Sequence, residues 1–113
     1  MHNKIGLIIN DKGIYDNVVG SELGLIEWNN ISGISTAEVD TNVCILIEVR
    51  NPYIYFENIK PTKKRIIENN FNVYGSPVLL NVKTLDYDFR KLQELLKSEL
   101  NNNKYRNKIG GSF

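Results

Sequence analysis

The fold is decided by the stretch FRKLQELLKSEL, residues Phe89–Leu100, near the end of the chain. Its apolar residues recur at spacings of three and four, which is the period of one face of an α-helix. That face carries Phe89, Leu92, Leu96 and Leu100, and Leu95 widens it. Such a stripe is stable only when it packs on another apolar surface. The stretch therefore predicts a C-terminal amphipathic helix that covers the rest of the chain.

The sequence before this helix predicts mainly β-strands separated by turns. The clearest strand is Val43–Val49, where apolar side chains occupy one face fully and the other in part. The residues Asn10–Gly13 and Asp40–Asn42 are typical of turns. Further strands are expected at Ile5–Ile9, Gly13–Asp16, Leu23–Trp28, Ile31–Val39 and Val78–Val82. Neighbouring strands joined by short turns favour antiparallel pairing.

Two helical segments are expected between the strands. Pro52 ends the sheet and can begin a short helix over residues 52–58, because proline lacks a backbone N–H and suits a first helical turn. A longer helix is predicted over Pro61–Asn70, with Ile66, Ile67 and Phe71 facing a core. A sheet with one open end would accept the C-terminal helix, which gives an α+β fold.

Length and charge limit the classes of protein that need considering. The chain has 113 residues and a formal net charge of +1, so we expect one domain, residues 4–101, followed by a polar flexible tail, residues 102–113. The near balance of charge argues against nucleic acid as a partner. Cys44 is the single cysteine, so no intrachain disulfide can form. With no secretory signal and no long apolar run, a cytoplasmic location is expected.

Four stretches resemble an uncharacterised bacterial family of pleckstrin-homology-like (PH-like) domains. They are DKGIYDN (Asp11–Asn17), GLIEWNNI (Gly24–Ile31), VRNPYI (Val49–Ile54) and YGSPV (Tyr74–Val78), and the resemblance covers Lys4 to Leu100. The pattern Gly-x-Ile-x-Trp-x-x-Ile is its most specific element. The family often carries two membrane helices before the domain, whereas this chain begins at the domain. It is therefore expected to be a stand-alone member or a segment of a longer protein at the cytoplasmic face of a membrane.

The resemblance implies a rolled antiparallel sheet or barrel capped by the last helix, and it implies no activity. The residues themselves also offer little for catalysis. His2 is the only histidine and lies at the terminus, and Cys44 lies in the strongest predicted strand, where a free cysteine packs as a small hydrophobe. The carboxylates are spread over predicted strand ends and exposed faces. We therefore expect no enzyme, no metal and no cofactor.

Two groups of residues are candidates for binding a partner. Tyr53, Tyr55 and Phe56 crowd the segment after the longest strand, where each either packs in the core or anchors an interface. Lys63, Lys64 and Arg65, preceded by Lys60, stand at the start of a predicted helix, where positive charge opposes the helix dipole. They form either a solvated face or a site for an anionic partner.

The expected function is therefore a non-catalytic binding module whose partner is another protein or a peptide. Two alternatives remain open: a small immunity or inhibitor protein that neutralises a toxin, and a sensor of anionic membrane surfaces that uses the basic residues. Open strand edges also leave a homodimer as an alternative.

Overall fold

The computed structural model describes residues 6–17, 23–57, 59–81 and 87–110, with side chains as far as Lys104. In chain order the elements are β1 (Gly6–Ile9), β2 (Gly13–Asn17), β3 (Gly24–Glu27), the 3-10 helix η1 (Trp28–Asn30), β4 (Ile31–Val39), β5 (Asn42–Val49), the 3-10 helix η2 (Pro52–Phe56), α1 (Pro61–Tyr74), β6 (Val78–Leu80) and α2 (Phe89–Gly110). This order confirms the predicted α+β class. Expectations for residues 1–5, 58, 82–86 and 111–113, among them His2, lie outside the described residues.

The strands form two antiparallel sheets, in the orders β1-β2-β3 and β4-β5-β6. Between β1 and β2, the Asn10 side-chain oxygen accepts the backbone N–H groups of Lys12 (2.9 Å) and Gly13 (3.3 Å), which fixes the predicted turn. Between β4 and β5, Asp40 and Thr41 adopt left-handed φ angles of 50° and 69°. The described strands do not close into one barrel, so the rolled PH-like barrel stays a prediction.

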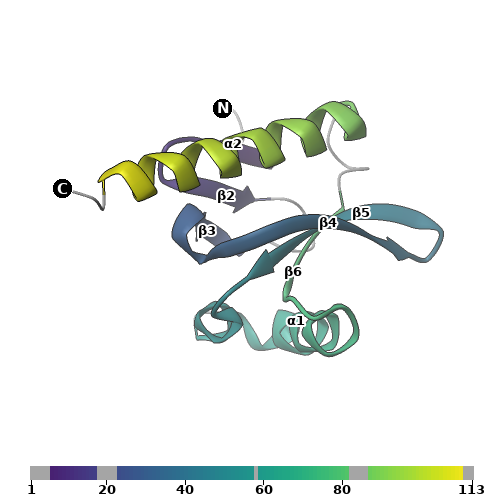
Figure 1. Ribbon diagram of the computed structural model, residues 1–113. Coiled ribbons are helices and arrows are strands. Elements are labelled where there is room, and N and C mark those ends of the chain that lie inside the picture. The colour runs from purple at the N-terminus through teal and green to yellow at the C-terminus, as the bar shows by residue number, and fades with distance from the viewer. Residues whose placement is uncertain (1–5, 18–22, 58, 82–86, 111–113) are drawn as a thin grey trace, which may run out of the picture.

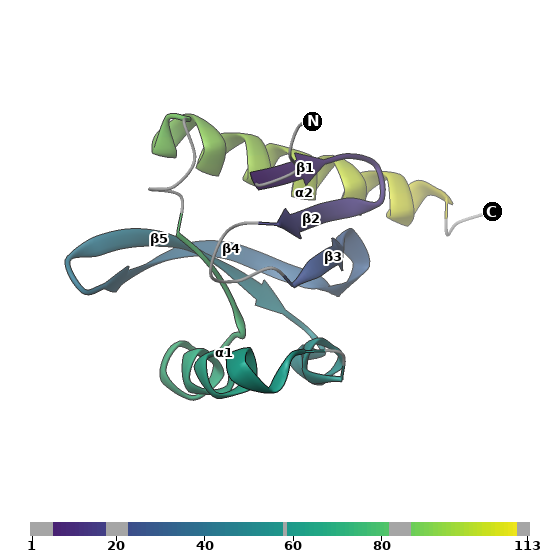
Figure 2. The ribbon, with the colours of Figure 1, turned by 180° about the vertical axis from the view of Figure 1, so that it is seen from behind.

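The sheets and helices are arranged in layers. Figure 1 shows α2 and α1 on opposite sides of the β4-β5-β6 sheet. Seen from behind, β1 and β2 lie alongside α2 (Figure 2). α2 contacts β4 and η1, while α1 contacts β6 and η2. The two helices therefore cover different surfaces of the protein.

The hydrophobic core lies beneath α2. Leu96 is fully buried, and Leu92 and Leu100 are each 5% exposed, so the leucine stripe packs inward as predicted. Each such leucine contributes about 1.5–3 kcal/mol through the apolar surface that it removes from water. The same core includes side chains from both sheets: Ile14, Ile26, Ile31, Ile34, Ile45, Ile47, Val78 and Leu80. α2 thus joins the two sheets through one core.

α2 differs from its prediction in length. The leucine stripe predicts a helix as far as Leu100, whereas the helix continues to Gly110. Asn103, on this extension, is only 7% exposed. The leucine stripe ends at Leu100, so hydrophobic spacing alone gave no sign of the extra turns.

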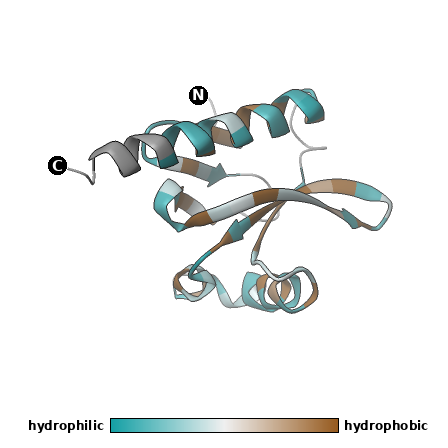
Figure 3. Ribbon diagram, viewed as in Figure 1, coloured by the Kyte–Doolittle hydropathy of each residue, from teal (hydrophilic) through white to brown (hydrophobic). Residues whose placement is uncertain are grey.

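α1 is longer than predicted and less buried. It ends at Gly75, whose φ of 84° lies in the left-handed region that glycine adopts without steric cost. Ile67 is buried as predicted and Phe71 is partly buried, but Ile66 is 55% exposed, so its predicted core position is wrong. Hydrophilic and hydrophobic residues are interspersed along α1 and along the part of α2 that Figure 3 colours. Among the described residues, neither helix is both long and apolar enough to span a membrane.

Candidate functional site

The first candidate site is the surface formed by η2 and α1. We define the η2–α1 surface by its exposed side chains: Tyr53, Ile54, Lys60, Lys64, Arg65, Ile66 and Val73. Tyr53 is 65% exposed and Val73 is 61% exposed, which is unusual for large apolar side chains. At about 100° per residue, Lys64 lies on the same flank of α1 as Phe71, whereas Ile66 and Val73 lie on the opposite flank, so these side chains do not form one continuous face.

An aromatic cluster holds η2 against α1. The rings of Tyr53 and Phe71 meet edge to face, with centroids 5.7 Å apart and planes at 82°. Phe56 packs on the same Phe71 ring at 5.9 Å with a tilt of 57°. Both geometries lie in the favourable range for aromatic pairs. Tyr53 therefore keeps a fixed position although most of its surface faces solvent.

Tyr55, which the sequence grouped with Tyr53 and Phe56, lies elsewhere. It is 6% exposed, and its hydroxyl accepts a hydrogen bond from Asn30 Nδ2 at 2.8 Å. The Asn30 side chain also accepts the N–H of Asn51 (2.8 Å) and donates to its carbonyl (3.1 Å). Burial raises the pKa of Tyr55, the charge of Glu27 raises this pKa further, and the Asn30 hydrogen bond lowers it. Tyr55 thus supports the η2–α1 surface from beneath.

The basic residues of the surface point in different directions. Successive helical residues are separated by about 100°, so Lys63, Lys64 and Arg65 cannot share one face. Lys63 is half-buried, whereas Lys64 and Arg65 are exposed. The first turn of α1 holds no acidic residue. Residues 52–74 contain four basic residues and two acidic residues, Glu57 and Glu68. The net charge of this region is therefore more positive than that of the whole chain.

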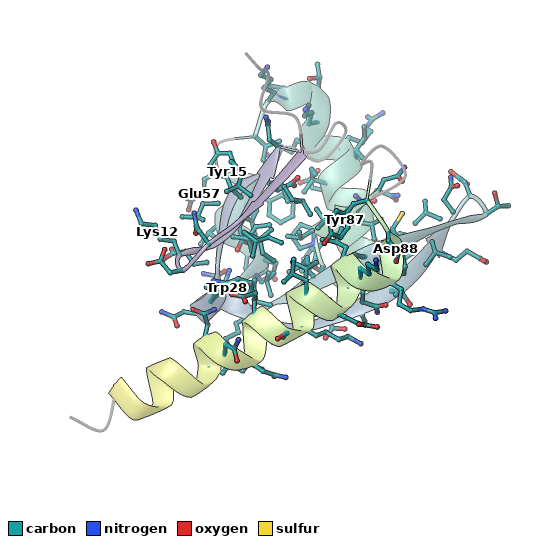
Figure 4. The ribbon with its side chains drawn as sticks, turned by 90° about the horizontal axis from the view of Figure 1, so that it is seen from above. Lys12, Tyr15, Trp28, Glu57, Tyr87 and Asp88 are labelled. Atoms are coloured by element: carbon teal, nitrogen blue, oxygen red, sulfur yellow. The ribbon has the colours of Figure 1, made fainter. Side chains whose placement is uncertain are left out.

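A second candidate site is a small polar hollow on another part of the molecule. It has a volume of about 80 Å³ and lies where the β1–β2 turn, η1 and α2 meet. We define the polar hollow by its lining residues: Asp11, Lys12, Glu27, Trp28, Asn29 and Asn103. Seen from above, Lys12 and Trp28 lie on the same side of the molecule, with α2 running past Trp28 (Figure 4). The sequence analysis did not identify this hollow.

Trp28 fixes the geometry of the hollow. It is 4% exposed, and its ring N–H donates to the Asn10 carbonyl at 2.8 Å. Its backbone N–H donates to the Lys12 carbonyl at 3.3 Å. Gly13 allows this close approach, because a Cβ at that position would lie 2.1 Å from the Ile26 carbonyl oxygen. The β1–β2 turn is therefore held rigidly over η1.

Two further observations concern Cys44 and the groups that could bind a metal ion. Cys44 is 3% exposed, and burial raises the pKa of its thiol, so the reactive thiolate is disfavoured. Within the described part of the chain, no group of three His, Cys, Asp or Glu residues is placed to hold a metal ion.

Comparisons with known proteins add no assignment: no family model, no curated protein and no solved structure matches this chain. The resemblance to PH-like domains therefore rests on the four sequence stretches alone. A function has to be argued from the two candidate sites.

Proposed function

We propose that this chain is a non-catalytic binding module that holds an acidic segment of another protein on the η2–α1 surface. The fold we propose for it is PH-like, with the two antiparallel sheets rolled around the core and α2 as the capping helix. In this view the sheets and α2 form the stable scaffold, and η2 with α1 presents the contact residues.

The observation that carries the proposal is an exposed aromatic side chain on the same side of α1 as an exposed lysine that has no ion pair among the described residues. Tyr53 is fixed by Phe71 yet 65% exposed, so it can bury area in a partner at little cost in side-chain entropy. Residues 64 and 71 are seven apart in α1, which places Lys64 on the same side of the helix as Phe71 and the Tyr53 ring. An acidic partner would gain both apolar contact and charge complementarity there.

The test is photo-crosslinking in the native cell, with Tyr53 replaced by a photoreactive phenylalanine analogue. We expect a captured protein whose crosslinked segment is acidic. Capture should fall about tenfold in the double variant Lys64→Glu plus Arg65→Glu, because both charges then repel the partner. The matched control is Arg90→Glu plus Lys97→Glu, which makes the same change in charge on exposed positions of α2.

Three outcomes would contradict the proposal. Capture that is equal in both double variants would show that the η2–α1 charges do not select the partner. Saturable binding to vesicles containing anionic lipid, lost in the Lys64→Glu plus Arg65→Glu variant, would assign the surface to a membrane. Capture of a segment without acidic residues would remove the charge argument.

A further inference from the structure

The polar hollow contains acceptor groups that have no partner within the described ranges of the chain. Among the described residues, the carboxylates of Asp11 and Glu27 have no hydrogen bond and no ion pair. Lys12 borders the same hollow, yet its ammonium is paired with neither carboxylate. In the part of the chain that the structure describes, the lining of the hollow therefore carries two carboxylates without an ion pair and one ammonium group.

Asn103 adds a third acceptor from the opposite side. Its side chain is 7% exposed, and Nδ2 donates to the Glu99 carbonyl at 2.7 Å. Because only the nitrogen can donate to a carbonyl, this bond fixes the orientation of the amide and leaves Oδ1 as an acceptor without a partner among the described residues. No fully buried side-chain polar atom of the described chain lacks a partner, so Oδ1 keeps some contact with solvent, and Asn103 lines the hollow.

We infer that the polar hollow binds a guanidinium group, carried by an arginine side chain or by a small guanidino compound. A guanidinium has five N–H donors in one plane and no acceptor, which suits two carboxylates and an amide oxygen that have no donor among the described residues. The hollow, at about 80 Å³, has room for a group the size of a few water molecules.

The charge of the lining favours this organic cation over a metal ion. Asp11, Glu27 and Lys12 sum to a formal charge of −1. Ca²⁺ and Mg²⁺ sites need several oxygen ligands at short, defined distances, and a neighbouring ammonium opposes a divalent ion more than a monovalent one. The hollow shares no lining residue with the η2–α1 surface, so this inference stands or falls independently of the proposed function.

Trp28 provides a direct probe, because it is the only tryptophan of the chain and lines the hollow. We would titrate the protein with N-acetyl-L-argininamide in about 20 mM salt, where screening is weak. The readouts are Trp28 fluorescence and the NMR signal of its ring N–H. We expect saturable changes in both, weakened by about tenfold in Glu27→Gln and in Asp11→Asn, because each loses a charge-assisted hydrogen bond. Lys12→Gln should bind several times more tightly.

The controls test whether binding depends on the charge of the ligand, on its shape and on the position of the carboxylate. Glu38→Gln removes an exposed carboxylate from β4, outside the hollow, and should bind like the unchanged protein. N-acetyl-L-citrullinamide has nearly the same shape without the charge and should not bind. Equal binding of citrullinamide, equal binding by Glu27→Gln, or a saturable response to CaCl₂ in place of the arginine compound would each overturn the inference. Tighter binding of an arginine-containing peptide than of free arginine would assign the group to a protein partner, and the reverse to a small molecule.

Discussion

α2 and α1 both place apolar residues at helical spacing, yet the sheets bury very different shares of the two stripes. In α2 the leucines at 92, 96 and 100 are at most 5% exposed. In α1 only Ile67 is fully buried, while Ile66 and Val73 are more than half exposed. α2 lies over the core that both sheets share, whereas α1 lies on the far side of one sheet (Figure 1).

Under the proposed function, α2 belongs to the scaffold and α1 to the contact surface. A helix whose stripe is buried contributes mainly to the free energy of folding. Exposed apolar and basic side chains on a helix can be substituted at little cost in folding stability, and they are available to bind a partner. Substitutions in α2 and in α1 test this comparison.

The largest effect is expected for Leu96→Ala in α2. It removes a fully buried side chain from the core between the sheets, so the free energy of unfolding should fall by about 2–5 kcal/mol. Chemical denaturation followed by Trp28 fluorescence measures the change. The control is Leu95→Ala, one residue away and 38% exposed. A similar loss of unfolding free energy in both variants would show that Leu96 is not more deeply buried than Leu95.

The next effect is expected for Gly75→Ala at the end of α1. No atom lies within 4 Å of the added Cβ, so the cost comes from the φ of 84° alone, about 1–2 kcal/mol. Thermal unfolding followed by circular dichroism measures it. Ser98→Ala, exposed in the middle of α2, should change stability by less than about 0.5 kcal/mol. An unchanged melting temperature in Gly75→Ala would mean that this helix end is not held in the left-handed conformation.

A smaller effect is expected for Tyr55→Phe beneath the η2–α1 surface, with a specific pH dependence. Losing the hydrogen bond from Asn30 should cost about 0.5–1.5 kcal/mol at neutral pH. Burial raises the pKa of Tyr55 above its ordinary 10.0, so folding favours the neutral phenol. That contribution is fully present below pH 10 and is lost as the pH rises through the higher folded-state pKa.

Unfolding free energies measured between neutral pH and pH 11 test this sign. The unchanged protein should lose stability above pH 10, and Tyr55→Phe should lose less. The control Tyr53→Phe, at a 65% exposed ring, should follow the unchanged protein. A steeper loss in Tyr55→Phe would mean that the tyrosinate is favoured in the folded state.

The smallest effect is expected for Ile66→Ser on the η2–α1 surface. The side chain is 55% exposed, so the free energy of unfolding, measured by chemical denaturation, should change by less than about 0.5 kcal/mol. A loss of stability comparable to that of Leu96→Ala would show that Ile66 is covered, for example by a second copy of the chain.

Much of the fold follows from local patterns that the sequence displays directly. The leucine spacing predicts the buried face of α2, and Asn10–Gly13 and Asp40–Asn42 predict the two tight turns. Such features were predictable because the residues that produce them are neighbours in the chain or lie one helical turn apart. The end of α2 was missed because residues 101–110 continue a helix without continuing the leucine stripe.

The candidate sites were predictable only in part. The sequence grouped Tyr53, Tyr55 and Phe56, but the structure turns Tyr55 inward to Asn30, and nothing near residue 55 in the sequence indicates that partner. It also grouped Lys63 with Lys64 and Arg65, although the helix separates their directions. The polar hollow was missed because Asn103 meets the other lining residues only when α2 packs against η1.

The sequence by itself determined the α+β class, the antiparallel hairpins and the face of α2 that is buried, since periodicity and turn residues act over a few positions. The tertiary structure alone decided that Tyr55 is buried, that Ile66 is exposed, and that Asp11, Glu27 and Asn103 surround one hollow. The burial of these side chains and their distances from one another depend on which segments, far apart in the sequence, pack together. Local sequence patterns do not specify that packing.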